Sequence, residues 1–115
     1  MESIKKRHLT TREELLLNEL ISRSHIVLPS NWRTTLLASD LDDGGMGSLS
    51  LYPQEIVCQT RSLGSLISDC QFRDIDGVSV IASLYLDKEG LLYELDMWKT
   101  DFSPLKVIPT EFQDV

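Results

Sequence analysis

The sequence predicts an α+β domain, in which one N-terminal helix packs on one face of an antiparallel β-meander of about five strands. Three observations lead to this prediction. Apolar residues with helical spacing are confined to the start of the chain. The remainder consists of short β-prone runs separated by turn residues, without a helix that could connect parallel strands. The 115 residues, 42% of them hydrophobic, correspond to a single ordinary domain over 1–115.

The helix is expected from about Thr11 to Ser24. Either Thr10 or Thr11 can form a capping box with the glutamate three residues later. The residues that follow make one apolar stripe for the sheet, formed by Leu16, Leu17, Leu20 and Ile21. Residues 1–8 are basic and are expected to fray, because they precede the first element.

Five strands are expected over 34–41, 48–52, 65–73, 78–86 and 91–99, with a further short strand or extended connection over 55–60. Dense turn signals separate them, namely 42–47, 74–77 and 87–90. Gly77 and Gly90 occupy turn positions that tolerate a positive φ. Pro104 and Pro109 predict an irregular C-terminal tail over 103–115.

The last hairpin allows two registers. A loop that closes Leu86 on Leu91 separates apolar from polar side chains well, whereas the turn chemistry favours a three-residue loop that pairs Asp87 with Leu91 and has a bulge at Gly90. In either register Glu94, Asp96 and the following Trp98 point the same way, because side chains alternate along a strand. In the first register they share a face with residues 81, 83 and 85.

The charge is uneven. The net charge is −7, and residues 34–115 alone carry −9. This balance argues against nucleic acid and anionic membranes as partners, and it favours a basic protein. The chain has no run of 18 apolar residues and shows no secretory signal, so a cytoplasmic protein is expected.

The candidate partner-binding residues are the carboxylates of two regions together with one aromatic residue: Asp40, Asp42, Asp43, Glu94, Asp96, Trp98 and Asp101. An aromatic ring among carboxylates provides contact area and can accept a cation over its face. The alternative for Trp98 is that it packs beneath residues 103–105. The alternative for the aspartates is that they stabilise turns through hydrogen bonds to the backbone.

No catalytic residue, metal site or cofactor is predicted. The cluster at 40–45 fails the calcium-loop pattern, since Leu51 stands where a glutamate is needed. The glycines at 44–47 lack the signature of a nucleotide-binding loop. Cys70 is expected in the middle of a strand as a small residue of the protein core. The sequence leaves the role of Cys58 open.

Two motifs, at 42–49 (DDGGMGSL) and at 93–105 (YELDMWKTDFSPL), together with the opening at 9–17, resemble a family of small uncharacterised bacterial proteins. That resemblance implies no activity. In size and acidity the chain is also similar in type to bacterial immunity proteins, which cover basic toxin domains.

These observations predict a small acidic non-catalytic binding protein, an immunity or inhibitor protein that neutralises a basic partner such as a toxin domain. The alternatives are a small carboxylate- or metal-dependent enzyme, or a self-associating structural domain with an open sheet edge. The sequence leaves the oligomeric state open.

Overall fold

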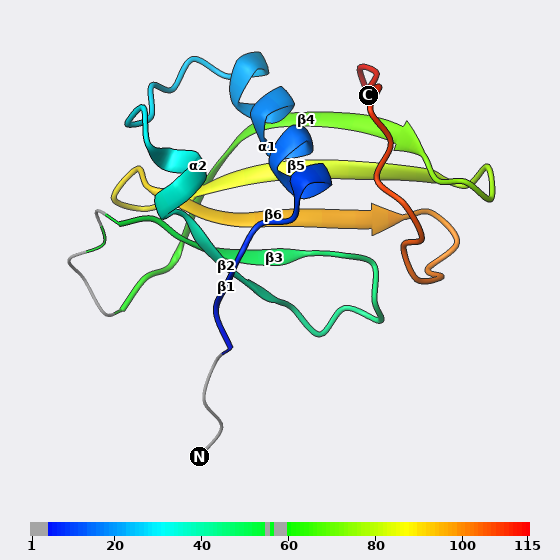
Figure 1. The fold of residues 1–115 in the computed structure, drawn as a ribbon, viewed down its shortest axis with the longest axis horizontal. Helices are drawn as coiled ribbons and strands as arrows, with labels where there is room; N and C mark the ends of the chain where they lie inside the picture. Colours follow the sequence, from blue (N-terminus) through cyan, green and yellow to red (C-terminus); the bar gives the residue numbers. More distant parts are fainter. Residues whose placement is uncertain (1–4, 55, 57–59) are drawn as a thin grey trace.

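The computed structural model describes residues 5–54, 56 and 60–115. One main helix packs on an open six-stranded antiparallel sheet with the strand order β1-β2-β3-β6-β5-β4 (Figure 1). The predicted α+β class is therefore confirmed. The elements are β1 (Arg7–His8), α1 (Thr11–Arg23), α2 (Trp32–Thr35), β2 (Leu37–Asp40), β3 (Leu49–Tyr52), β4 (Leu63–Arg73), β5 (Ser79–Asp87) and β6 (Leu92–Lys99).

The strand order differs from a simple meander. Strands β4, β5 and β6 do form a meander, but β6 then pairs with β3, which comes far earlier in the chain. As a result β6 lies in the middle of the sheet, with β5 on one side and β3 on the other. Glu94 and Leu95 therefore have cross-strand neighbours on both sides.

Helix α1 follows the prediction closely. Thr10 and Glu13 form the capping box, in which each side chain bonds the backbone N–H of the other residue. Leu16, Leu17 and Leu20 are fully buried against the sheet. Burial of each leucine contributes about 1.5–3 kcal/mol, so this stripe holds the helix on the sheet.

Two segments near the N-terminus differ from expectation. Thr34 and Thr35 lie in α2 and not in a strand, because their backbone N–H and hydroxyl groups all donate to the carbonyl oxygen of Asn31. Arg7 and His8, expected in a frayed terminus, pair with β2 as β1. Most of the element expected over 55–60 lies outside the described residues, as does Cys58.

The last hairpin combines features of both predicted registers. The backbone N–H of Asp87 donates to the carbonyl oxygen of Leu91, and Gly90 has φ 85°, as the turn chemistry favours. A bulge at Tyr93 then shifts the register, so that Glu94 lies opposite Tyr85. The bulge restores the separation of apolar and polar side chains that the three-residue loop alone would lose.

The two faces of the sheet differ. One face carries the core beneath α1 and α2, which contains Cys70 and Phe72 as well as the alternating apolar residues of β5 and β6. The other face has no helix of the described chain on it (Figure 1). We call it the helix-free face, and its residues on the three central strands are Ser50, Tyr52, Ile81, Ser83, Tyr85, Glu94, Asp96 and Trp98.

Within the described residues, no helix is long and apolar enough to cross a membrane.

Candidate functional site

The centre of the helix-free face is a pair of carboxylates with small neighbours. Glu94 lies between Tyr85 of β5 and Ser50 of β3, and Asp96 lies opposite Ser83 of β5. Both carboxylates are partly buried. Their serine neighbours have short side chains.

The two carboxylates hold their protons more tightly than usual. Burial raises the pKa of Glu94, and the nearby Asp96 raises it further. Burial likewise raises the pKa of Asp96, with a further contribution from Asp43, against a hydrogen bond with Ser48 that lowers it. Within the described part of the chain, neither Glu94 nor Asp96 forms an ion pair. A cation from outside would therefore be favoured here.

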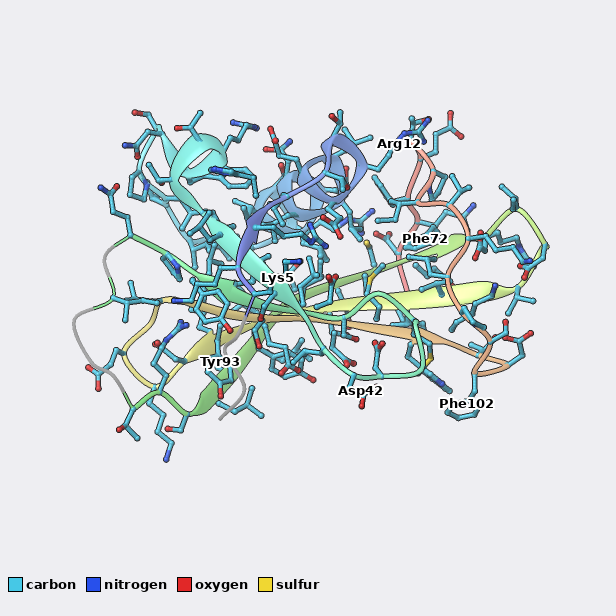
Figure 2. All side chains as sticks on the ribbon, turned by 60° about the horizontal axis from the view of Figure 1, so that its bottom comes forward. Lys5, Arg12, Asp42, Phe72, Tyr93 and Phe102 are labelled. Atoms are coloured by element: carbon cyan, nitrogen blue, oxygen red, sulfur yellow. The ribbon has the colours of Figure 1, made fainter. Side chains whose placement is uncertain are left out.

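Two exposed aromatic rings lie at the end of this face. Trp98 is 42% exposed and Phe102 is 69% exposed, and their ring centroids are 6.4 Å apart. In Figure 2 the helices lie above the sheet, and Phe102 projects on the opposite side. Trp98 lies on the helix-free side of β6, whereas the carbonyl oxygen of Pro104 accepts a hydrogen bond from Lys99 on the core side. The tail segment 103–105 crosses the 42–47 loop, with Pro104 against Gly45.

The predicted site residues do not all come together. Asp40 lies on the other side of the sheet from Glu94, because it faces Leu49 in the register, and it binds the guanidinium of Arg7 at 2.8 Å. This hydrogen bond lowers the pKa of Asp40. Arg7 also binds Glu13 of α1 at 2.8 Å, so Asp40 helps to attach β1 to the helix. Its role is accounted for by the fold.

Asp42, Asp43 and Asp101 lie in turns. Asp42 is exposed. The carboxylate of Asp43 accepts the backbone N–H groups of Met46 and Ser48, so it stabilises the turn, as the alternative to partner binding predicts. Asp101 similarly accepts the backbone N–H and the hydroxyl of Ser103. Of the predicted set, Glu94, Asp96 and Trp98 remain together on one face, with Asp43 close enough to act on Asp96.

The structure brings the two sequence motifs into contact. The backbone N–H of Leu105 donates to the carbonyl oxygen of Gly45 at 2.9 Å. A Cβ on Gly47 would lie 2.9 Å from a methyl group of Leu105, and Gly47 has φ 100°, so both space and backbone conformation require glycine there. The hydroxyl of Ser48 accepts the backbone N–H of Met97 at 2.8 Å. Much of both motifs thus builds a single joint at one end of the sheet.

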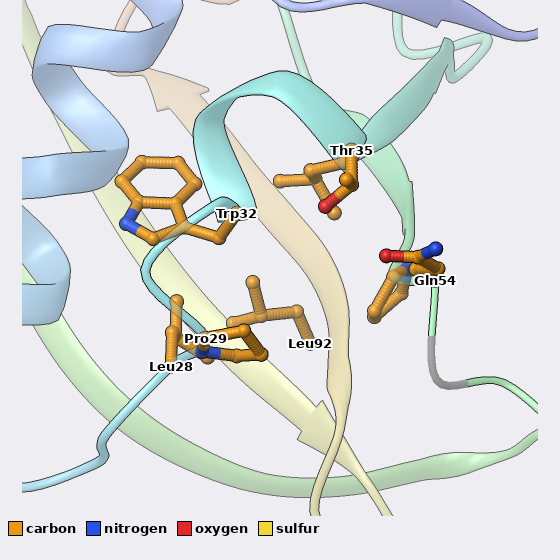
Figure 3. Close-up of a pocket in the computed structure, with 8 residues that line it drawn as sticks. Leu28, Pro29, Trp32, Thr35, Gln54 and Leu92 are labelled. Atoms are coloured by element: carbon orange, nitrogen blue, oxygen red, sulfur yellow. The ribbon is translucent and has the colours of Figure 1, made fainter.

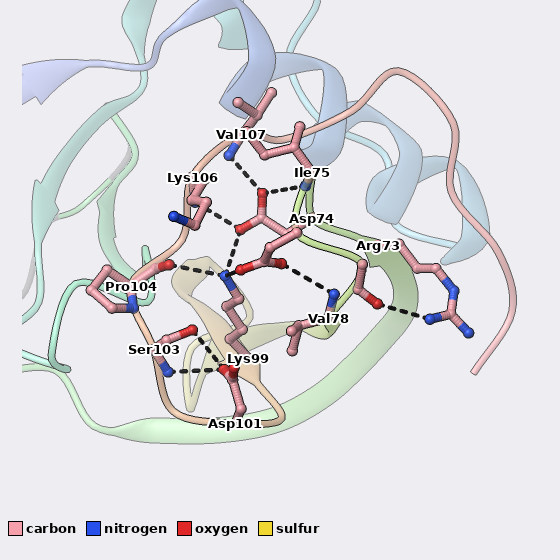
Figure 4. Close-up of polar contacts among 12 residues, drawn as sticks. Arg73, Asp74, Ile75, Val78, Lys99, Asp101, Ser103, Pro104, Lys106 and Val107 are labelled. Atoms are coloured by element: carbon pink, nitrogen blue, oxygen red, sulfur yellow. Dashed lines mark hydrogen bonds and ion pairs between the residues drawn. The ribbon is translucent and has the colours of Figure 1, made fainter.

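The same end contains a buried ionic cluster that sequence reasoning missed (Figure 4). The fully buried amine of Lys99 donates to Asp74 at 2.9 Å, to Asp76 at 2.6 Å and to the carbonyl oxygen of Pro104 at 3.1 Å. We call these three charged residues the lysine cluster. One signal was available, since Lys99 has the same strand parity as the core residues Leu95 and Met97.

Asp74 also anchors the C-terminal tail. Its carboxylate accepts the backbone N–H groups of Lys106 at 2.7 Å, Val107 at 2.9 Å and Ile75 at 2.7 Å, as drawn in Figure 4. Burial by itself would raise the pKa of Asp74, but these hydrogen bonds and Lys99 outweigh it and lower the pKa to about 2. The tail is irregular, as expected, yet it is held firmly.

A small apolar cavity lies on the helix side between Trp32, Leu92 and Pro29 (Figure 3). Its volume of about 20 Å³ has room for roughly one water molecule, which is too small for an organic ligand. Among the described residues, no group of three or more His, Cys, Asp or Glu side chains is placed to hold a metal ion.

Comparison with known proteins gives one match. Residues 6–109 correspond to the family described as "Domain of unknown function (DUF6984)". The chain belongs to the DUF6984 family. No curated protein matches it, and no solved structure does. The DUF6984 range contains the joint between the motifs, the lysine cluster and the helix-free face, and it ends within the C-terminal tail.

Proposed function

We propose that this protein is a small non-catalytic binding protein whose helix-free face docks a basic protein, in the manner of an immunity protein that neutralises a toxin domain. One observation carries the proposal. Glu94 and Asp96 are partly buried carboxylates without a cationic partner in the described chain, and they share the helix-free face with the exposed ring of Trp98, whose neighbour is Phe102.

Charge complementarity defines the partner. A Lys or Arg side chain placed over Glu94 and Asp96 relieves the repulsion between the two carboxylates and supplies the missing counter-charge. The net charge of −7 also attracts a basic protein over longer distances and speeds the encounter. Trp98 and Phe102 add apolar contact area of the kind that often dominates binding energy at interfaces.

The backbone at Phe102 supports an interface role for this residue. Phe102 has φ 65°, in the left-handed region where a bulky side chain costs on the order of 1–3 kcal/mol. Its ring is mostly exposed, so burial in the core does not offset that cost. Strain retained at an exposed aromatic residue is typical of a functional surface.

The first test is capture of partners from a cell lysate at low and high salt, with the wild type and matched variants. We expect one basic protein to be retained by the wild type, released by salt, and lost with Asp96→Lys and with Trp98→Ala. Glu111→Lys changes the charge equally at an exposed tail position, and we expect it to retain the partner. Retention that is indifferent to Asp96→Lys and Trp98→Ala would contradict the proposal.

A second variant separates binding from folding. Phe102→Gly removes the strained side chain, so we expect the melting temperature to rise while partner retention falls. Loss of binding in a stabilised protein cannot result from misfolding. If Phe102→Gly binds as tightly as the wild type, the aromatic part of the proposed interface is wrong.

A further inference from the structure

We propose that the outer edge of β4 is a self-association surface, along which two copies of this chain pair β4 against β4 in antiparallel orientation. The proposal concerns the edge of the sheet and does not depend on the proposed basic partner. Leu66 lies opposite Tyr85 and so points to the helix-free side, but the proposed contact is made through the outward backbone of β4. It rests on the backbone of Leu63–Asp69, on the side chains of that segment, and on a comparison of the two sheet edges.

The edge of β4 already accepts an antiparallel segment at one point. Gln71 and Gln113 exchange two backbone hydrogen bonds, each 2.8 Å long, so the C-terminal tail covers the edge there. From Leu63 to Asp69, β4 pairs with β5 on its inner side only, as far as the described residues show. The outward N–H and C=O groups of this stretch are therefore available to another strand.

The side chains of this stretch do not protect the edge. Residues 62–68 contain no charged residue and no proline. Leu63 and Leu66 are each 50% exposed. Sheet edges that remain unpaired are usually protected by lysine, proline or very short strands. Among the described residues, the protective features of this stretch are the bulges between Leu63 and Ser68 and the exposed carboxylate of Asp69 at its end.

The opposite edge of the sheet is different. Strand β1 is only two residues long, and Lys5 and Lys6 come directly before it. A short strand flanked by lysines discourages another chain from pairing. The contrast indicates that the unprotected β4 edge has an occupant.

A second copy is the occupant that fits. Residues 62–68 carry no charge and expose Leu63 and Leu66, so apart from Asp69 at its end the stretch offers nothing to the charges of a basic partner. Two copies, each with a net charge of −7, approach most readily where their contact surface carries little charge. Antiparallel pairing around a two-fold axis near Leu66 brings the exposed leucines of both copies together. The shared surface is small, so the dimer is expected to be weak and dependent on concentration.

The test is sedimentation velocity on the full chain from micromolar to millimolar concentration. We expect a monomer–dimer equilibrium for the wild type and loss of the dimer in Leu66→Lys. Leu15→Lys is the matched control, because Leu15 is 38% exposed on α1 and receives the same substitution. Trp98→Ala should leave the dimer intact, which separates this surface from the proposed partner site.

Hydrogen exchange provides a second readout that does not depend on mutation. Amides of residues 63–69 should become more protected as the wild-type concentration rises, while those of β1 should not change. A monomer at every concentration, or a dimer that survives Leu66→Lys, would overturn the proposal. So would a partner captured by the wild type and lost in Leu66→Lys while both proteins remain monomers.

Discussion

The two sides of strand β6 hold charged groups in opposite ways. On the core side, Lys99 is fully buried and is surrounded by two carboxylates and a carbonyl oxygen. On the helix-free side, Glu94 and Asp96 are less buried but have no cation beside them in the described chain. The pKa of Asp74 is lowered, whereas the pKa values of Glu94 and Asp96 are raised.

This difference shows that burial alone does not decide the state of a carboxylate. Burial is the largest influence on Asp74 and on Glu94, and in both cases it acts to raise the pKa. Asp74 has three backbone N–H donors and a lysine, which reverse the direction. Among the described residues, no such donor acts on Glu94. A partly buried carboxylate without hydrogen-bond donors is therefore a better candidate for binding a partner's cation than a carboxylate that already has several donors.

The largest expected effect comes from removing a carboxylate from the lysine cluster on the core side of β6. Asp74→Ala leaves the buried amine of Lys99 with one carboxylate fewer and frees the tail, so we expect a loss of about 3–5 kcal/mol in the free energy of unfolding. Asp96→Ala on the other side should change it by less than about 0.5 kcal/mol. Urea denaturation of both variants measures the difference. Similar losses for the two variants would show that the sides of β6 are not distinct.

The pH dependence of stability should have opposite signs on the two sides. The pKa of Asp74 is lowered from 3.8 to about 2, so its contribution to stability is present above about pH 4 and is lost as the pH falls toward 2. The raised pKa values of Glu94 and Asp96 act the other way. Their contribution is favourable at low pH and is lost as the pH rises through the folded-state pKa values.

The variant Glu94→Gln/Asp96→Asn checks this sign. It should be more stable than the wild type at neutral pH, because two disfavoured charges are gone, and the gain should disappear at acidic pH. Urea midpoints measured over a pH series for both proteins provide the comparison. A gain that does not change with pH would mean that these carboxylates are not strained by their surroundings.

The smallest expected effect concerns two buried serines. Ser48 bonds the backbone of Met97, whereas the buried hydroxyl of Ser68 has no hydrogen-bond partner among the described residues. Ser48→Ala should cost about 1 kcal/mol, and Ser68→Ala should be neutral or slightly stabilising. Thermal denaturation resolves the two. An equal loss for both would show that satisfaction of hydrogen bonds does not separate them.

Local patterns predicted most of the elements. The capping box at Thr10, the stripe at Leu16, Leu17 and Leu20, and the glycine turns at Gly77 and Gly90 depend on neighbours in the sequence. The pairing of β6 with β3 does not depend on neighbours in the sequence. It joins distant segments, and neither strand carries a periodic pattern that indicates its partner. The bulge at Tyr93 could not be predicted either. It arises because the turn fixes one register and the burial of apolar side chains requires another.

The candidate site was predicted in part. Period-two alternation placed Glu94, Asp96 and Trp98 on one face, and the structure agrees. The alternation could not show that Asp40 lies on the opposite side of the sheet from these three residues. That placement depends on how β2 pairs with β3, which the sequence of β2 does not reveal. The exposure and strain of Phe102 were also out of reach, since both arise from the turn that follows β6.

The central position of β6 has a consequence for synthesis on the ribosome. Strand β3 can gain its second neighbour only after residues 92–99 have left the exit tunnel. Until then Leu49 and Leu51 lack the strand that completes their side of the core. We therefore expect the sheet to be completed late and folding to be slow for a domain of this size, since it waits for contacts between distant segments.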